Sequence, residues 1–335
     1  MVYFVDLYYI ETQRLKSSEI YYLAKSIRIK DRVFTIRENI GKIRPTPEEE
    51  ANLISKPNLA LEIKVINKKI NMSKAIYKTK HIQLDNVHRL EKTRYWEYMF
   101  SLFLASSEKE YFEVGSEIEY VHGTTAIEGN TFSLQQVDDL LQMRVPPSDK
   151  SLREINEVQN YFKVKNFRES YRRMVTIPFI RKLHELIMDK IDTQSAGKFR
   201  RIDSIGIRGV DIIVSPAILI ESELQIIIDE YYANIKTGGH PFEEALLFHY
   251  KFEIIHPFTD GNGRVGREII NHMLTKEGFP RLIIRKTDRE KYINALQCGN
   301  QGFFENMLSD FIDILEDARA TLFEEILSGK LSMNS

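Results

Sequence analysis

The sequence has little cysteine, little net charge and no long hydrophobic run. Cys298 is the single cysteine among 335 residues, so no disulfide can form within the chain, which fits a reducing compartment. The formal net charge is −1, which argues against a protein that coats nucleic acid. No apolar run approaches the roughly 20 residues of a membrane-spanning helix, and the first residues lack the basic start of a signal peptide. We therefore expect a cytoplasmic protein without a membrane partner.

The charge is distributed unevenly along the chain. Residues 1–100 hold 19 Lys and Arg against 12 Asp and Glu, a net charge of +7, and the remainder holds 28 against 36, a net charge of −8. Hydrophobic residues make up 43% of the sequence, enough for a buried core. A charge shift of this size predicts separate units. We place the boundary near residue 85, where the spacing of apolar residues changes.

The first unit, residues 1–85, is predicted to contain β-structure. Residues 20–37 alternate in polarity around Lys30-Asp31, which predicts a hairpin, and residues 42–57 resemble a loop that enters a helix. The role of this unit stays open between target recognition, dimerisation and nucleic-acid binding. Residues 1–100 contain no helix-turn-helix pattern and no aromatic-basic RNA motif, so nucleic acid is the least favoured partner.

The remainder is predicted to be helical. Apolar residues recur at steps of three and four after about residue 85, and Ser133 with Gln136 and Ser151 with Glu154 form two predicted capping boxes. Further helices are expected at residues 178–191, 220–236, 241–255, 264–277 and 304–328. Residues 202–214 interrupt them with β-branched residues on both sides of Arg208-Gly209. This pattern predicts a short hairpin whose edge could pair with an extended peptide.

Residues 256–267, HPFTDGNGRVGR, combine features that suit a polyphosphate. The glycines of Gly261–Gly263 let the backbone turn and aim its N–H groups at an anion, just before a predicted helix whose dipole favours negative charge. Arg264 and Arg267 lie three residues apart on that helix and can both reach phosphate oxygens. This stretch therefore predicts a phosphate-binding site.

Two further side chains in the stretch suit a transfer reaction. Asp260 offers one carboxylate, and one carboxylate with phosphate oxygens and water is a common way to hold Mg²⁺. His256 titrates near neutral pH and can take a proton from a hydroxyl group. A single histidine at a helix end is more often structural, so the prediction depends on these features occurring together.

HPFTDGNGRVGR matches the Fic family signature HxFx(D/E)GNGRxxR at every specified position. The resemblance continues in HYKFEIIHPF, in GKFR at 197–200 and in DREKYINAL at 288–296. It covers about residues 86–325 and leaves 326–335 as a tail. The resemblance implies a mainly α fold, a Fic helical bundle with the short β-hairpin flap at 202–214, preceded by the small β-containing unit.

The resemblance also implies an activity, the transfer of AMP from ATP to a Ser, Thr or Tyr hydroxyl of a target protein, which could be the chain itself. His256 would be the base, and Asp260 would hold Mg²⁺ against the α- and β-phosphates. The implied nucleotide-binding residues are Phe258 beneath the loop, the Gly261, Asn262 and Gly263 backbone with Arg264 at the phosphates, Arg267 at the γ-phosphate, and Asn300 at the adenosine. The chain departs from related sequences at Ile293, where a second aromatic residue often follows Tyr292.

Residues 124–129, TTAIEG, resemble the inhibitory motif (S/T)xxxE(G/N) of related enzymes through Thr124, Glu128 and Gly129. A carboxylate paired with Arg267 would occupy the guanidinium group that otherwise binds the γ-phosphate. We expect a partly desolvated Glu128–Arg267 ion pair in the resting protein. The alternative is an ordinary carboxylate at a helix end.

Other functions stay open at this point. The same site could remove AMP from a modified protein or transfer another phosphate-containing group. A function of another class would be a nucleic-acid-binding regulator that uses the basic N-terminal unit. The sequence does not fix the target protein or the oligomeric state, and a homodimer is one arrangement that it allows.

Overall fold

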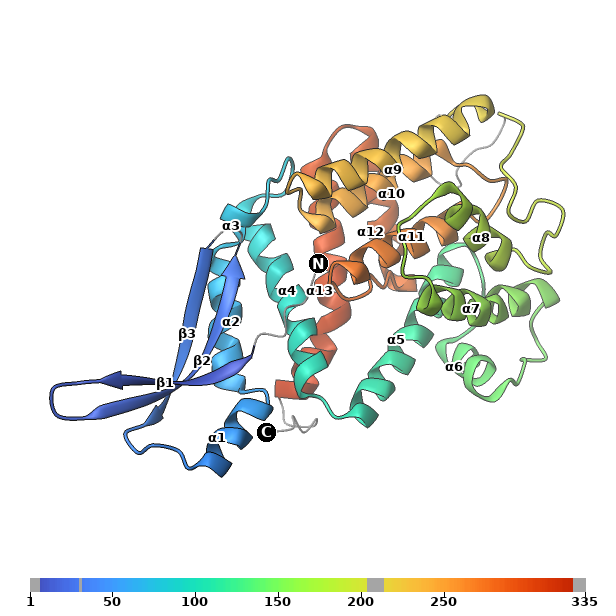
Figure 1. The fold of residues 1–335 in the computed structure, drawn as a ribbon. Helices are drawn as coiled ribbons and strands as arrows, with labels where there is room; N and C mark the ends of the chain where they lie inside the picture. Colours follow the sequence, from blue (N-terminus) through green and yellow to red (C-terminus); the bar gives the residue numbers. More distant parts are fainter. Residues whose placement is uncertain (1–6, 30–31, 204–213, 328–335) are drawn as a thin grey trace.

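A small sheet and a larger helical bundle make up the chain. The computed structural model describes residues 7–29, 32–203 and 214–327. Figure 1 shows the sheet at one end with α1, α2 and α3 beside it, and α4 between this part and the remaining helices. The predicted fold class, mainly α with a small β-containing N-terminal unit, is confirmed. Residues 204–213, which carry most of the predicted hairpin flap, lie outside the described residues.

Three antiparallel strands form the sheet in the order β1-β2-β3. They are β1 (Tyr8–Arg14), β2 (Glu19–Ile29) and β3 (Arg32–Gly41). The pairing of β2 with β3 confirms the predicted hairpin, although its turn at 30–31 is not among the described residues. Strand β1 was not predicted, and its pairing with β2 completes the sheet.

The N-terminal unit also contains helices. These are α1 (Pro47–Ser55), α2 (Leu59–Asn71) and α3 (Ser73–Ile76). A helix was expected after residues 42–57, and α2 follows them; α1 lies inside this segment, where a loop was predicted. Val65 of α2 packs against Ile27 and Ile29 of the sheet, and the buried ion pair of Lys25 with Glu62 joins the two elements at 2.7 Å.

The helical part begins at α4 and continues to the last described residue. Its elements are α4 (Leu84–Phe103), α5 (Ser106–Ile127), α6 (Leu134–Asp138), the π-helix η1 (Asp139–Met143), α7 (Leu152–Ser170), α8 (Ile177–Ile187), η2 (Ala217–Leu219), α9 (Ile220–Lys236), α10 (Pro241–Ile255), α11 (Asn262–Lys276), η3 (Lys286–Asp288), α12 (Arg289–Asn300) and α13 (Phe304–Leu327). Both predicted capping boxes are present, at the starts of α6 and α7. Five further predicted helices correspond to α8, α9, α10, α11 and α13.

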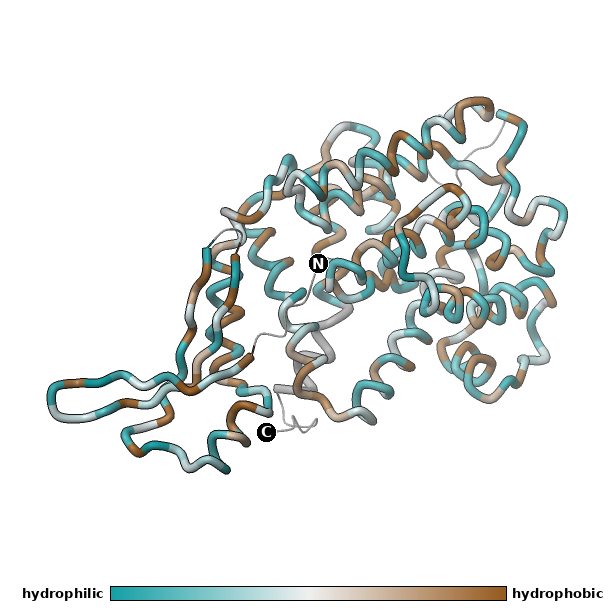
Figure 2. Tube along the Cα trace, in the orientation of Figure 1, coloured by the Kyte–Doolittle hydropathy of each residue, from teal (hydrophilic) through white to brown (hydrophobic). Residues whose placement is uncertain are grey.

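One large apolar core fills the bundle, and α10 and α11 run through it. In Figure 2 apolar and polar residues alternate along the helices, as expected for elements that bury one face. Gly266 of α11 lies so close to α10 that an added Cβ would meet Glu253 Oε1 at 2.7 Å and His249 at 2.9 Å. No helix among the described residues is long and apolar enough to cross a membrane.

Candidate active site

The loop between α10 and α11 is held in one conformation by its own backbone and by Asn262. His256 ends α10 in a left-handed conformation, with φ of +47°, and its N–H donates to Phe252 O at 2.9 Å. Gly261, with φ of +79°, precedes α11. The Asn262 side chain accepts a hydrogen bond from Phe258 N and donates one to Phe258 O, both at 2.8 Å. The side chain of Asn262 therefore fixes the loop, and the first N–H groups of α11 stay available to an anion.

Phe258 is fully buried and stacks on His184 of α8. The ring centroids are 3.7 Å apart and the rings are parallel to within 1°. His184 accepts from Gly197 N at 2.8 Å through Nδ1, so its Nε2 donates to Asp260 O at 3.0 Å. Burial lowers the pKa of His184 to about 4, which keeps this ring neutral. His184 therefore positions the backbone of Asp260.

The His256 ring is neutral at physiological pH. Only 9% of the residue is exposed, and burial lowers its pKa to about 4. A neutral imidazole is the form that can accept a proton from a hydroxyl group.

Arg200 holds the backbone around His256. It is 4% exposed, and its guanidinium group donates to His256 O at 2.7 Å, to Ile255 O at 3.1 Å, to Ile202 O at 2.8 Å and to Ser215 O. Ile202 and Ser215 are on the two sides of the predicted flap. One side chain thus joins the end of α10 to both flanks of that segment.

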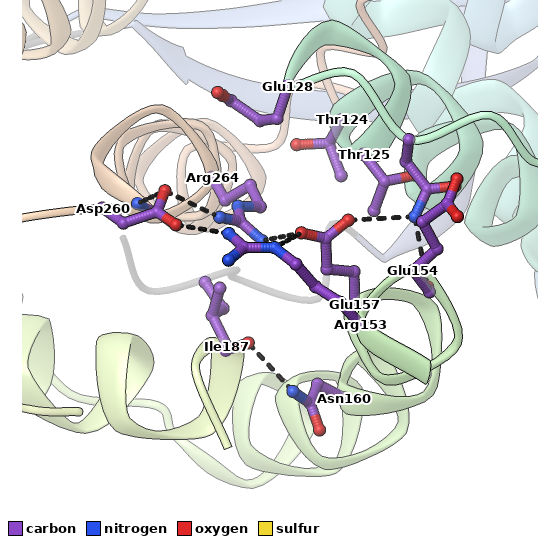
Figure 3. Close-up of polar contacts among 12 residues, drawn as sticks. Thr124, Thr125, Glu128, Arg153, Glu154, Glu157, Asn160, Ile187, Asp260 and Arg264 are labelled. Atoms are coloured by element: carbon purple, nitrogen blue, oxygen red, sulfur yellow. Dashed lines mark hydrogen bonds and ion pairs between the residues drawn. The ribbon is translucent and has the colours of Figure 1, made fainter. Parts of the chain in front are cut away.

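The Asp260 carboxylate is surrounded by positive groups (Figure 3). Arg153 of α7 donates to Oδ2 at 2.6 Å, while Oδ1 accepts from Gly261 N at 2.6 Å and from Arg264 at 3.1 Å. Burial acts to raise the pKa of Asp260, but Arg264 and Arg153 bring it below its ordinary value. The carboxylate is therefore ionised, as a cation ligand must be.

Glu157 of α7 connects the two arginines. Its Oε1 lies 3.3 Å from Arg153 Nε and 3.4 Å from Arg264 Nη1. Its Oε2 accepts from Asn130, the residue that follows Gly129, at 3.0 Å. Figure 3 shows these side chains meeting between α7 and the start of α11. Arg264 is 1% exposed and is fixed by this network.

The predicted ion pair between Glu128 and Arg267 is present. Arg267 Nη2 donates to Glu128 Oε1 at 2.8 Å, and the same guanidinium group donates to Thr124 Oγ1 at 2.8 Å and to Thr124 O at 2.9 Å. The Arg267 side chain is 2% exposed and the Glu128 side chain 33%, so the pair is partly desolvated as expected. Burial acts to raise the pKa of Glu128, but Arg267 and Arg264 hold it below its ordinary value. Both groups are therefore charged.

Glu128 also lies over the first turn of α11. A Cβ added to Gly263 would collide with Glu128 Oε1 and would approach Arg267 Nη1 to 2.8 Å. Glycine at this position is what lets a carboxylate come this close to the helix N-terminus, where negative charge is favoured. The carboxylate of Glu128 occupies the place that the sequence predicts for a phosphate oxygen.

A second buried group lies behind Arg267. The guanidinium carbon is 5.6 Å from the centre of the Tyr292 ring, and Tyr292 shares a hydrogen bond of 3.0 Å with His249. Burial raises the pKa of the neighbouring Glu253 to about 8, so this carboxyl is mainly protonated at neutral pH.

Asn300, the predicted adenosine contact, is the exposed last residue of α12. Its role stays a prediction.

The protein alone supplies only part of the coordination that a divalent cation needs. The described residues contain no group of three or more His, Cys, Asp or Glu that could hold a metal. Asp260 supplies one ionised carboxylate whose side chain is 42% exposed. One such ligand suits Mg²⁺ that is also bound by nucleotide phosphates.

Comparisons with known proteins agree with this geometry. Residues 174–274 match the family model described as the Fic/DOC family. This segment is a Fic domain. It contains His256, Asp260 and both arginines of the loop and α11, whereas Glu128 and Arg153 lie before it.

Relatives and solved structures extend the Fic likeness to more of the chain. "Protein adenylyltransferase Fic" of Aedes aegypti is 31% identical over 60% of this chain and 40% of its own length, and that of Drosophila ananassae is 33% identical over 55% and 37%. The chain thus spans about 40% of the length of these relatives. Fic-1 from C. elegans has a TM-score of 0.64 at 23% identity, covering 85% of this chain and 79% of its own. A Fic domain protein from Bacteroides thetaiotaomicron has a TM-score of 0.59 at 23% identity, covering 70% and 94%. The structural likeness shows the fold.

Sequence reasoning missed the residues that support the Fic site from other helices. His184, Arg153 and Glu157 lie far from the signature in sequence and carry no local pattern of their own. Arg200 belongs to the GKFR segment at 197–200, and the resemblance of that segment to the family was the signal that could have identified it.

Proposed function

We propose that the protein transfers AMP from ATP to a Ser, Thr or Tyr hydroxyl of a protein, which could be another copy of this chain. One observation carries the proposal: a neutral His256, an ionised Asp260 and the N-terminus of α11 with Arg264 and Arg267 meet in a single loop. The relatives named protein adenylyltransferase Fic support the same reaction.

The nucleotide would bind with its phosphates at the first turn of α11. N–H groups at a helix N-terminus and two guanidinium groups complement a polyphosphate. Glu128 already places a carboxylate at Gly263, which supports the view that this position accepts an anion.

His256 would take the proton from the attacking hydroxyl. The hydroxyl oxygen forms a bond to the α-phosphorus while the bond from that phosphorus to the bridging oxygen of pyrophosphate breaks. The product is an AMP phosphodiester on the target, and pyrophosphate leaves with its charge held by Arg264 and Arg267. Arg200 keeps His256 in place during this exchange by holding its carbonyl group.

Asp260 would hold Mg²⁺, which neutralises charge on the phosphates. His184 supports this role because it fixes the Asp260 backbone at 3.0 Å. Without the cation, the phosphates would face Asp260 directly, so chelation with EDTA should remove transfer.

Glu128 would inhibit this reaction in the resting protein. Its carboxylate pairs with the guanidinium group of Arg267 and also fills the space beside Gly263. ATP could then not place its γ-phosphate on Arg267, and the α-phosphorus would not be aligned for attack.

The position of the transferred label tests the reaction. The Glu128→Gly variant should incorporate label into protein from α-³²P-ATP and none from γ-³²P-ATP. The Glu128→Gly/His256→Ala variant, checked for folding by circular dichroism, should lose at least about 100-fold in rate. Incorporation from the γ-position would show transfer of phosphate instead and would contradict the proposal.

A further inference from the structure

Both oxygens of the Asp260 carboxylate are already engaged. Oδ1 accepts from Gly261 N and Arg264, and Oδ2 accepts from Arg153 at 2.6 Å. A carboxylate oxygen has two lone pairs, so Oδ2 keeps one beside its bond from Arg153, but a cation bound there would lie next to the positive guanidinium group. Arg153 reaches the Asp260 carboxylate from α7, and its charge therefore opposes a cation at Oδ2 (Figure 3).

The positive charge of Arg153 lies at the N-terminus of its own helix, where it is unfavourable. Arg153 is the second residue of α7, and a positive charge at a helix N-terminus opposes the helix dipole. Its charge is offset there by Asp260 at 2.6 Å and by Glu157 at 3.3 Å. The ion pair with Asp260 thus joins α7 to the loop before α11, and the charges of Arg153, Arg264, Asp260 and Glu157 balance.

The two arginines on Asp260 differ in their freedom to move. The Arg264 side chain is 2% exposed and is enclosed between Glu157 and Asp260. The Arg153 side chain is 56% exposed. It can swing its terminal nitrogens into water while its Nε stays beside Glu157, so Arg153 is the partner that a cation can displace.

We propose that Arg153 competes with the divalent cation for Asp260 and thereby sets the cation concentration that the site needs. This inference rests on the proposed function, because it takes Asp260 as the cation ligand. It adds a second resting ion pair to the Glu128–Arg267 pair. The two pairs come from different helices, α7 and the end of α5, so releasing Glu128 leaves Arg153 on Asp260.

Binding of Mn²⁺, followed by electron paramagnetic resonance with saturating ADP, measures this competition without any transfer. Arg153→Gln should tighten Mn²⁺ binding about three- to tenfold, the scale of one charge-assisted, partly exposed ion pair. Lys163→Gln is the matched control. Lys163 lies on the same helix, is 50% exposed and pairs with Asp189 instead, so its loss removes one positive charge from α7 without touching Asp260.

The outcomes separate this inference from the proposed function. Unchanged or weaker Mn²⁺ binding by Arg153→Gln overturns the competition, as does equal tightening by Lys163→Gln. Asp260→Asn, checked for folding, should abolish the Mn²⁺ site. If Asp260→Asn binds Mn²⁺ as the wild type does, Asp260 is not the cation ligand, and the cation part of the proposed function fails together with the inference. Loss of Mn²⁺ binding in Asp260→Asn with no effect of Arg153→Gln removes the inference alone.

Discussion

At the scale of single residues, the base that we propose, His256, has a backbone conformation that histidine rarely adopts. A left-handed φ of +47° costs His256 of the order of 1 kcal/mol, and surrounding contacts must offset that cost. Arg200 makes these contacts, because its planar guanidinium group reaches four carbonyl groups at once. An ammonium group cannot span the same set.

Arg200→Lys should therefore impair catalysis more than nucleotide binding. We expect kcat to fall about tenfold or more, because His256 loses its alignment, while the affinity for ATP changes less than about twofold. Steady-state kinetics in the Glu128→Gly background, with nucleotide titration calorimetry, would measure both. Arg181→Lys, which loses a bond to Gly197 O outside the loop, is the control. An equal loss of affinity and kcat would show that Arg200 supports the fold as a whole.

At the scale of elements, α10 and α11 pack closely enough to bury an ionisable group. The lack of a side chain at Gly266 lets α10 come close to α11. Glu253 of α10 faces Gly266, and its side chain is only 5% exposed. Burial raises the pKa of Glu253 to about 8, despite the opposing effect of Arg267. The pKa of Glu253 is higher in the folded protein than in the unfolded chain, so its contribution to stability is fully present when the pH is below the unfolded pKa. This contribution is lost as the pH rises through the folded pKa of about 8.

Glu253→Gln should remove that pH dependence, because glutamine mimics the protonated carboxyl. Relative to the wild type, the variant should gain at least about 1 kcal/mol in the free energy of unfolding between pH 6 and pH 8. Urea unfolding at several pH values measures the difference. Burial lowers the pKa of His249 to about 3, and its own contribution to the pH dependence is the same in both proteins, so it cancels in the difference. A difference that is constant with pH would show that Glu253 is ionised in the folded protein.

The elements that sequence reasoning found are those with local signals. The capping boxes at Ser133 and Ser151 and the glycine turn before α11 depend on neighbouring residues, and all three are confirmed. The phosphate site of residues 256–267 stays a prediction. Strand β1 was missed because its place in the sheet depends on its pairing with β2. Helix α1 lies inside the segment that was predicted as a loop, although its capping box of Thr46 with Glu49 is a local signal. Arg153, His184 and Arg200 act across distances of 56 to 107 residues, which no local pattern encodes.

At the scale of the whole molecule, a short segment before α4 is docked on the start of α10, in addition to the apolar packing of α2 against α4. Glu243, near the start of α10, is fully buried and accepts from Lys80 N at 3.1 Å, His81 N at 2.5 Å and Ile82 N at 3.2 Å. Lys78 also forms an isolated bridge with Gly239. The boundary near residue 85, which the charge shift predicted and which stays a prediction, thus lies just after a segment fixed to α10.

Glu243→Ala should loosen this attachment. Three backbone N–H groups would lose their acceptor, at a cost of about 2–4 kcal/mol. We expect a lower melting temperature and faster proteolytic cleavage within residues 76–83. Glu230→Ala, which removes an exposed carboxylate paired with Lys251, should leave both unchanged. Unaltered proteolysis of Glu243→Ala would mean that the segment is held mainly by other contacts.

The inhibitory pair between Glu128 and Arg267 is the central claim, and comparing transfer rates from α-³²P-ATP in four folded proteins tests it most directly. Glu128→Gly should exceed the wild type by about tenfold or more, because Arg267 becomes free for the γ-phosphate. Arg267→Ala should fall below the wild type, and the double variant should match Arg267→Ala, since releasing an absent arginine gains nothing. If Glu128→Gly is folded and no faster than the wild type on any protein offered, including itself, the claim is contradicted.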